Sequence, residues 1–262
     1  MSWQKKERYD MADLCEIMRM LRAEDGCPWD KVQTHESIRK NLIEETYEAV
    51  EAIDCKDTSM LREELGDVLL QVVFHSQMEE ETGTFTFADV ANDVCQKLVV
   101  RHPHIFGDIK ADTVDEVLDN WNRIKQETKG QKTAAETLNA VPKQLPALMR
   151  SEKVQGRARK AGFDYPDADM AFGDLKSEIN ELADAMQEAD ETHIAEEIGD
   201  TLFAAVNVAR LYGMDPEELL TRSCNKFIDR FTKVEQAAKE QGIDMKASDL
   251  DTLNALWKEA KK

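Results

Sequence analysis

The sequence is poor in the residues that interrupt helices. It has 11 glycines and six prolines among 262 residues, where ordinary usage of roughly 12% would give about 30. Apolar residues make up 42% of the chain, which is enough to build a buried core and argues against wholesale disorder. The scarcity of turn-forming residues therefore predicts a fold of long helices.

Positive charge is also scarce. The chain has 34 Lys and Arg residues against 53 Asp and Glu residues, and a formal net charge of −19. Because a nucleic-acid polymer or an anionic membrane would approach a like-charged surface, we expect neither as a partner. The longest apolar stretch, residues 68–74, is far too short to cross a bilayer. The first ten residues are polar and do not resemble a signal peptide.

Paired cysteines are missing as well. The five cysteines form no CxxC motif and have no histidine spacing typical of zinc. They are Cys15, Cys27, Cys55, Cys95 and Cys224. An odd set of this kind is typical of reduced thiols in a reducing compartment, so we expect a cytoplasmic protein.

Apolar residues recur at helical spacing along most of the chain, which predicts an all-α fold. Leu14, Ile17, Met18 and Leu21 mark a first helix, and Leu42, Val50 and Ile53 mark a second. Further helices are expected near 59–81, 86–101, 113–129, 145–161, 167–189, 192–212, 215–240 and 248–261. The β-like run at 84–87 is expected to lead into a helix.

The chain divides into two related halves. Residues 130–146 are polar and contain Gly130, Pro142 and Pro146, which indicates a connection. We expect tandem helical bundles at 1–130 and 145–262, joined by a linker at 131–144. One constant shift in numbering carries Glu45, Glu48, Glu64 and Asp67 onto Glu178, Glu181, Glu197 and Asp200. The same shift aligns Gly66 with Gly199 and Leu69 with Leu202, which favours a duplication.

Two further blocks repeat at slightly different shifts. Lys97 and Arg101 match Lys226 and Arg230, each pair one helical turn apart. More loosely, Trp121 and Lys125 match Trp257 and Lys261. The bases could contact phosphate oxygens or only pair with surface acids. For Trp257, base stacking competes with an ordinary core position.

The repeated acids have a spacing that suits metal binding. Residues i and i+3 lie on one face of a helix, so each pair forms a two-carboxylate clamp. In an antiparallel hairpin turning at residues 54–59, the two clamps would face each other. Four converging carboxylates require cations. Oxygen ligands select Mg²⁺ first and Mn²⁺ second, and the absence of histidine argues against a di-iron site. Since Mg²⁺ commonly completes its coordination with phosphate oxygens, a phosphate ester is the expected substrate.

Several motifs resemble one enzyme family. Glu44-Glu-Thr-Tyr-Glu48 and Glu64-Leu-Gly-Asp67 are similar to the EExxE and ExxD signature of the all-α nucleoside triphosphate pyrophosphohydrolases. Cys27-Pro-Trp-Asp30, Arg101-His-Pro-His-Ile-Phe106 and Leu145-Pro-Ala-Leu-Met149, together with two tandem copies of the signature, resemble the MazG family. The resemblance covers almost the whole chain.

The resemblance implies Mg²⁺-dependent cleavage of a nucleoside triphosphate between the α and β phosphates. It also implies a homodimer that shares its sites and an active C-terminal copy. The implied metal ligands are Glu178, Glu181, Glu197 and Asp200, and the implied nucleotide-binding residues are Lys226, Arg230, Trp257, Asp174, Ser177 and His193. Ser177 departs from the signature, which has Glu there. The N-terminal copy, with Glu45, Glu48, Glu64, Asp67, Lys97 and Arg101, is held as a second or vestigial site.

For the reaction we expect direct attack by water, because no Ser, Cys or His is positioned by sequence as a covalent nucleophile. A neighbouring carboxylate, Glu197 or Glu196, would accept the proton. Two alternatives stay open at this point. One is a narrower dUTPase-like or phosphoribosyl-ATP hydrolase, and the other is a non-catalytic helical interaction module.

Overall fold

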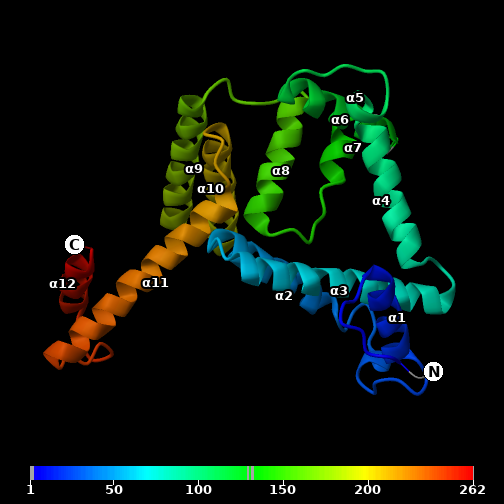
Figure 1. The fold of residues 1–262 in the computed structure, drawn as a ribbon. Helices are drawn as coiled ribbons and strands as arrows, with labels where there is room; N and C mark the ends of the chain where they lie inside the picture. Colours follow the sequence, from blue (N-terminus) through cyan, green and yellow to red (C-terminus); the bar gives the residue numbers. More distant parts are fainter. Residues whose placement is uncertain (1–2, 129, 131–132, 262) are drawn as a thin grey trace. The chain divides into compact units, whose positions relative to one another are not determined.

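The computed structural model describes residues 3–128, 130 and 133–261, and all the regular elements among them are helices, as predicted (Figure 1). The chain divides into two compact units, Met1–Lys125 and Gln126–Lys262. The first contains α1 (Met11–Arg22), η1 (Asp30–Val32), α2 (Arg39–Asp54), α3 (Thr58–Thr82), α4 (Phe87–Arg101), α5 (Pro103–Phe106) and most of α6 (Val114–Thr128). The second contains α7 (Ala134–Asn139), α8 (Ala147–Lys160), α9 (Ala168–Glu188), α10 (Glu191–Leu211), α11 (Pro216–Gln241) and α12 (Leu250–Ala260).

The ten long helices agree closely with the ranges expected from periodicity, whereas three short elements, η1, α5 and α7, were missed. Helix α7 lies inside the stretch expected to be a linker. Its Thr133 cap accepts a hydrogen bond from the backbone N–H of Glu136, and the helix packs against α8. Residue 129 of an expected helix and residues 131 and 132 of the expected linker lie outside the described residues.

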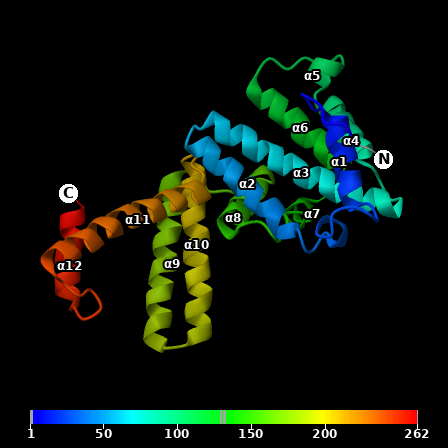
Figure 2. The same cartoon turned by 60° about the horizontal axis from the view of Figure 1, so that its bottom comes forward.

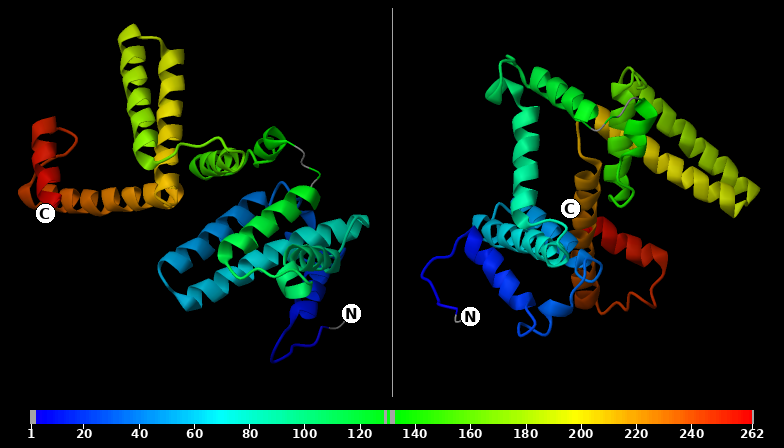
Figure 3. Two further views of the ribbon diagram at one scale, coloured as in Figure 1. Left: turned by 90° about the horizontal axis from the view of Figure 1, so that it is seen from above. Right: turned by 90° about the vertical axis from the view of Figure 1, so that its right-hand side faces the viewer.

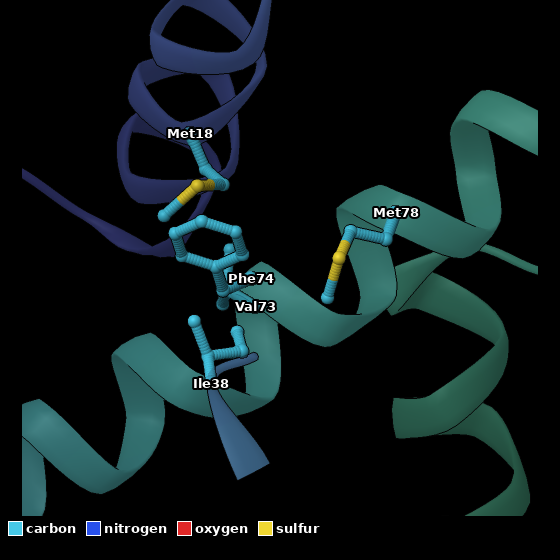
Figure 4. Close-up of a cluster of buried hydrophobic side chains, with 5 residues drawn as sticks. All are labelled: Met18, Ile38, Val73, Phe74 and Met78. Carbon is cyan, nitrogen blue, oxygen red and sulfur yellow. The ribbon is translucent and has the colours of Figure 1, made fainter. Parts of the chain in front are cut away.

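In the first unit, α1 packs against the C-terminal half of α3. Figure 4 shows the resulting core, in which Met18 of α1 lies over Phe74 and Val73 of α3, with Ile38 and Met78 beside them. The almost buried Arg22 guanidinium bonds both carboxylate oxygens of Glu81 and lies 5.3 Å from the Phe74 ring. This contact ties α1 to α3 at the edge of the core.

In the second unit, α8 packs against α10, and α12 folds back on α11. The core between α11 and α12 consists of Val234, Ala238, Leu256 and Ala260. A buried guanidinium, Arg210, binds Asp164 in the loop after α8. The second unit therefore uses a different ion pair to hold the loop after α8 against α10.

The α2–α3 and α9–α10 hairpins turn in the same way. Lys56 and Ala189, which occupy equivalent positions in the two copies, both have the left-handed φ of 56° that non-glycine residues seldom adopt. The next residues, Asp57 and Asp190, cap the second helix by accepting two backbone N–H groups each. The repeat seen in the acids thus extends to the backbone of the turn.

The helices that follow the hairpins differ in length. Helices α4 and α11 occupy equivalent places in the two copies, but α4 ends at Arg101, whereas α11 continues to Gln241. Pro103 explains the earlier end, because proline disfavours helical backbone at His102 and has no N–H to donate. In the second unit α11 runs away from the α9–α10 pair (Figures 2 and 3). No helix in the described ranges combines the length and the apolar character needed to cross a membrane.

Candidate metal and nucleotide site

The C-terminal hairpin brings three predicted ligands together. Glu178 of α9 and Glu197 and Asp200 of α10 each offer one carboxylate oxygen within 4.8 Å of the other two. The fourth predicted ligand, Glu181, lies outside this group, and its Oε1 accepts a hydrogen bond from the Ser177 hydroxyl at 3.0 Å. Two antiparallel helices with ExxE and ExxD spacing are sufficient to form the cluster.

Glu197 is the buried member of the cluster, with 7% of its surface exposed. Its Oε1 lies 3.1 Å from His193 Nε2, while its Oε2 is buried and has no hydrogen-bond partner among the described residues. The other His193 nitrogen lies 3.3 Å from Glu188, and the hydrogen bond to Glu188 is the main reason why the pKa of His193 is raised. A buried carboxylate oxygen without a donor costs free energy unless a cation binds it.

The charges in the cluster also fit a cation. Burial, followed by the charges of Glu181, Asp174 and Asp200, raises the pKa of Glu178. These carboxylates repel each other, and oxygen atoms alone form the donor set. Such a set suits a hard divalent ion of the Mg²⁺ type.

The N-terminal hairpin forms a similar cluster with a different trio. Here Glu45 and Glu48 of α2 and Glu64 of α3 have oxygens within 4.8 Å of one another. Asp67 is not in the trio, but its charge, after burial, raises the pKa of Glu45. Burial and then Glu48 raise the pKa of Glu64. Two ligands therefore come from the first helix in this copy, whereas two come from the second helix in the C-terminal copy.

Sequence reasoning missed Tyr165, which lies in the loop between α8 and α9. The charged groups that act on its phenol are Asp174, one of the predicted nucleotide-binding residues, and Glu178. Burial is the largest cause that raises the pKa of Tyr165 to about 12, with Asp174 and Glu178 adding to it.

The predicted phosphate-binding bases lie on a different part of the second unit. Lys226 and Arg230 line a cavity of about 450 Å³ between α11 and the end of α12. Its other lining residues are Arg222, Asn225, Asp229, Lys233, Ala260 and Lys261. The half-buried Trp257 packs against Phe227, with 5.2 Å between ring centroids. This groove is rich in positive charge on a strongly acidic protein.

No ion pair in the described part of the chain joins this groove to the carboxylates of the cluster. Among the described residues, none of the contacts given for Glu178, Glu197 or Asp200 involves Lys226, Arg230 or Trp257. Lys226 lies ten residues into α11, about 15 Å along a helix that leads away from the hairpin. The second predicted proton acceptor, Glu196, is exposed and lies outside the trio.

The N-terminal counterparts of the groove are arranged differently. The Arg101 guanidinium lies 5.1 Å from the centre of the Trp121 ring, and the His102 ring lies 5.0 Å from it. Lys97 is exposed on α4. The tryptophan of this copy is therefore covered by side chains of its own unit.

Comparison with known proteins adds the family. The model of the MazG nucleotide pyrophosphohydrolase domain matches this chain twice, at residues 33–106 and 171–235. The chain belongs to the MazG family. The two MazG matches contain all eight predicted metal ligands together with Lys97, Arg101, Lys226 and Arg230, and they confirm the tandem arrangement. As a member of this family, the chain is a hydrolase of phosphorus anhydrides.

Several named MazG relatives align along most of the chain. The nucleoside triphosphate pyrophosphohydrolase/pyrophosphatase MazG of Thermotoga maritima is 40% identical over 95% of this chain and 94% of its own length. The nucleoside triphosphate pyrophosphohydrolase of Escherichia coli K12 is 42% identical over 95% of this chain and 96% of its own. That of Mycolicibacterium smegmatis is 32% identical over 79% of this chain and 68% of its own.

Proposed function

We propose that this MazG protein hydrolyses nucleoside and deoxynucleoside triphosphates between the α and β phosphates, with Mg²⁺, to give a monophosphate and pyrophosphate. The cluster of Glu178, Glu197 and Asp200 carries the proposal, because it is an all-oxygen donor set with a buried oxygen that has no partner among the described residues. The names of the relatives support the triphosphate substrate. Mn²⁺ is the expected substitute for Mg²⁺, because it accepts similar ligands.

In this proposal the trio holds the ion, and Glu181 joins it when the Ser177 hydrogen bond is released. Bound Mg²⁺ would lower the pKa of a water molecule and neutralise charge on the phosphates. Glu197 is placed to accept a proton, because His193 holds one of its oxygens and no described residue bonds the other. Glu196 stays the alternative acceptor, at the exposed neighbouring position.

We further propose that the protein is a homodimer in which the basic groove of one protomer completes the carboxylate site of the other. Lys226 and Arg230 do not reach their own cluster, although a triphosphate needs both cations and metal. The α9–α10 hairpin also leaves large apolar side chains exposed. They include Ile179, Met186, Ile198, Leu202 and Phe203, which are 42–63% exposed. Exposed apolar side chains gathered on one hairpin favour an interface with a second protomer.

A mixing experiment tests the shared site. Glu197→Gln and Arg230→Ala protomers should each be inactive alone, and exchange of subunits should restore about a quarter of the activity if each site uses both protomers. Sedimentation velocity gives the oligomeric state in parallel. A dimer whose mixed variants regain no activity would contradict site sharing, and a monomer with full activity would contradict the dimer.

The reaction itself is tested by identifying the products. Each common NTP and dNTP is incubated with the full chain and Mg²⁺, and ³¹P NMR distinguishes pyrophosphate from inorganic phosphate. We expect monophosphate and pyrophosphate, and no turnover after chelation. Release of diphosphate and phosphate would overturn the cleavage position. Turnover of dUTP or phosphoribosyl-ATP alone would favour the narrower enzymes.

A non-catalytic module would make a different prediction: Glu178→Gln would leave every measured product unchanged.

We also propose a cytoplasmic location. All five cysteines, each within the described ranges, are free thiols, which suits a reducing compartment. Fluorescence microscopy of a tagged full-length chain in its own cell checks this location.

A further inference from the structure

The imidazole ring of His193 lies between two carboxylates at the turn of the C-terminal hairpin. Its Nδ1 lies 3.3 Å from Oε2 of Glu188, the last residue of α9, and its Nε2 lies 3.1 Å from Oε1 of Glu197 in α10. Both neighbours of the ring are carboxylate oxygens, which accept hydrogen bonds when ionised. We call Glu188, His193 and Glu197 the histidine clamp. The clamp connects the end of one helix with a buried acid of the next.

The backbone of His193 is fixed as well. Asp190 caps α10, and its Oδ1 accepts the backbone N–H of Thr192 at 2.9 Å and that of His193 at 3.3 Å. Glu197 follows His193 by four residues, and side chains at this spacing are neighbours on one helix face. Because the cap uses only the backbone of His193, its side chain can be changed without loss of the cap.

The clamp leaves Glu197 with one engaged oxygen and one free oxygen. Glu197 is 7% exposed. Its Oε1 faces His193, and its buried Oε2 has no hydrogen-bond partner among the residues that the structure describes. Ordering a glutamate side chain around an ion costs conformational entropy. A carboxylate that is already held at one oxygen has lost part of this freedom, so ion binding costs less.

The N-terminal copy has no such clamp. At the positions equivalent to the first two clamp residues it has Cys55 and Met60, and neither side chain is a strong hydrogen-bond donor. Glu64, the counterpart of Glu197, is half-buried instead of buried. Its cluster takes one ligand from the second helix of the hairpin, whereas the C-terminal cluster takes two. The clamp therefore occurs in the copy whose second helix supplies more of the ligands.

We propose that His193 is a positioning residue that holds Glu197 with its second oxygen toward the bound metal ion, and that the histidine clamp makes the C-terminal cluster the tighter of the two cation sites. The inference rests on the proposed function, because it takes the cluster to bind Mg²⁺ or Mn²⁺. It gives His193 a role besides the nucleotide contact that the family resemblance implies. Removal of a group that orients a metal ligand commonly lowers metal affinity about 10- to 100-fold.

Binding of Mn²⁺ to the full chain tests the clamp without turnover. The C-terminal cluster is followed alone in a parent chain that carries Glu45→Gln/Glu64→Gln, and electron paramagnetic resonance measures free Mn²⁺ during the titration. His193→Met introduces the residue of the other copy and should raise the Kd for Mn²⁺ about tenfold or more. His193→Gln should stay within about threefold of the parent, because its amide N–H can still donate to Glu197.

The direction of the change separates the clamp from a general charge effect. Removing a histidine removes positive charge or no charge, so electrostatics alone would leave Mn²⁺ binding unchanged or strengthen it. Weaker binding in a folded His193→Met chain would therefore come from the lost contact with Glu197. An unchanged or lower Kd in His193→Met, or an equal increase in His193→Gln, would overturn the inference.

A second variant keeps the test valid if circular dichroism shows that His193→Met does not fold. Glu188→Gln releases the other side of the ring at a side chain that is 65% exposed, and it should raise the Kd for Mn²⁺ about two- to fourfold. Glu191→Gln removes an exposed acid from the same turn. It is the matched control for lost charge, and equal effects of the two changes would contradict the clamp.

Building the clamp into the N-terminal copy tests the comparison between the clusters. Cys55→Glu/Met60→His is introduced into a chain whose C-terminal cluster carries Glu178→Gln/Glu197→Gln. The Kd for Mn²⁺ of the N-terminal cluster should fall about tenfold. An unchanged Kd in a folded chain would show that the clamp does not make one cluster tighter than the other.

Hydrolysis measured in parallel separates this inference from the proposed function. If the chain cleaves no triphosphate but the clamp variants bind Mn²⁺ as expected, the proposed function fails and the inference holds. If the chain cleaves triphosphates and His193→Met binds Mn²⁺ as tightly as its parent, the inference alone fails. Absence of Mn²⁺ binding at the C-terminal cluster would overturn both.

Discussion

The two copies share a carboxylate cluster and differ in what surrounds it. Their hairpins have the same left-handed turn residue and the same Asp cap, and each hairpin brings three carboxylates within 4.8 Å. Beyond the hairpin, α4 of the N-terminal copy ends at Arg101, whereas its counterpart α11 continues without a break to Gln241. The comparison shows that ExxE and ExxD on a hairpin are sufficient to form a cluster, but that the arrangement of the predicted nucleotide-binding bases depends on elements outside the hairpin.

The predicted bases and tryptophans are arranged differently in the two copies. After the break at Pro103, Arg101 and His102 both lie against Trp121. In the C-terminal copy, Arg230 lines an open groove, and Trp257 contacts Phe227 and Lys261. In the N-terminal copy, the break at Pro103 is therefore found together with a covered Trp121 ring and with Arg101 in contact with that ring.

The largest expected difference between the copies is in turnover. Glu178→Gln/Glu197→Gln should reduce pyrophosphate release about 1,000-fold, because charge stabilisation at the reacting phosphates is lost. Glu45→Gln/Glu64→Gln should leave at least half of the activity. Coupled pyrophosphate detection on the full chain measures both, and circular dichroism checks that each variant stays helical. Loss in the second variant alone would show that the N-terminal copy is the active one.

A tenfold difference is expected at the two tryptophans. Trp257→Ala should raise KM for ATP about tenfold if the ring stacks on the base, since removal of such stacking costs about 1–3 kcal/mol. Trp121→Ala should change KM less than twofold, because Arg101 and His102 already cover its ring. The same kinetic measurement applied to both variants decides. Equal effects would mean that both tryptophans serve the fold or that both copies bind nucleotide.

In the absence of metal, the stability of both units should change in the same direction with pH and with the loss of one clustered acid. The pKa of Glu178 and that of Glu45 are raised in the folded state, so the stability of the metal-free fold falls as pH rises from 4.5 through those raised values. At pH 7, Glu178→Gln and Glu45→Gln should each raise the unfolding midpoint by about 1–3 °C. The gain should vanish near pH 4 and reverse in excess Mg²⁺. Calorimetry measures these shifts, and a response in one unit only would assign Mg²⁺ to that cluster alone.

The smallest expected effect comes from a contact that the C-terminal copy lacks. His75 Nδ1 lies 2.7 Å from His35 Nδ1, and His35 Nε2 lies 2.8 Å from Glu79. Burial, followed by the charge of His35, lowers the pKa of His75 below 6.5. The unfolded chain therefore takes up this proton first as pH falls through 6.5, and the first unit loses stability.

His75→Val introduces valine, the residue found at the equivalent position 208 of the other copy. It should reduce the fall in the unfolding midpoint of the first unit between pH 7.5 and 6 by about 1 °C. Hydrogen exchange of α3 and α10 peptides at the two pH values follows each unit separately. An unchanged pH dependence of α3 in the variant would show that His75 does not cause it.

The sequence predicted the long helices and the acid clusters because both depend on local spacing. Apolar periodicity locates a helix, and i, i+3 acids on two adjacent helices leave few alternative arrangements. Tyr165 and the trio membership were not predictable in this way. Tyr165 lies in a loop that is fixed by the ion pair of its neighbour Asp164 with Arg210, and these two residues are 46 apart in the sequence. The choice of three among four acids depends on rotamers and on hydrogen bonds such as that from Ser177 to Glu181.

The hairpin turn has a consequence for protein engineering. Lys56-Asp57 and Ala189-Asp190 adopt the same left-handed and capping conformations although their first residues differ in size and charge. The tips of the two hairpins are therefore interchangeable parts, and residues 54–58 could replace residues 187–191 without altering the alignment of the two acid pairs. A library of chimeric hairpins could thus vary the tip freely while it keeps the distance between the carboxylates constant.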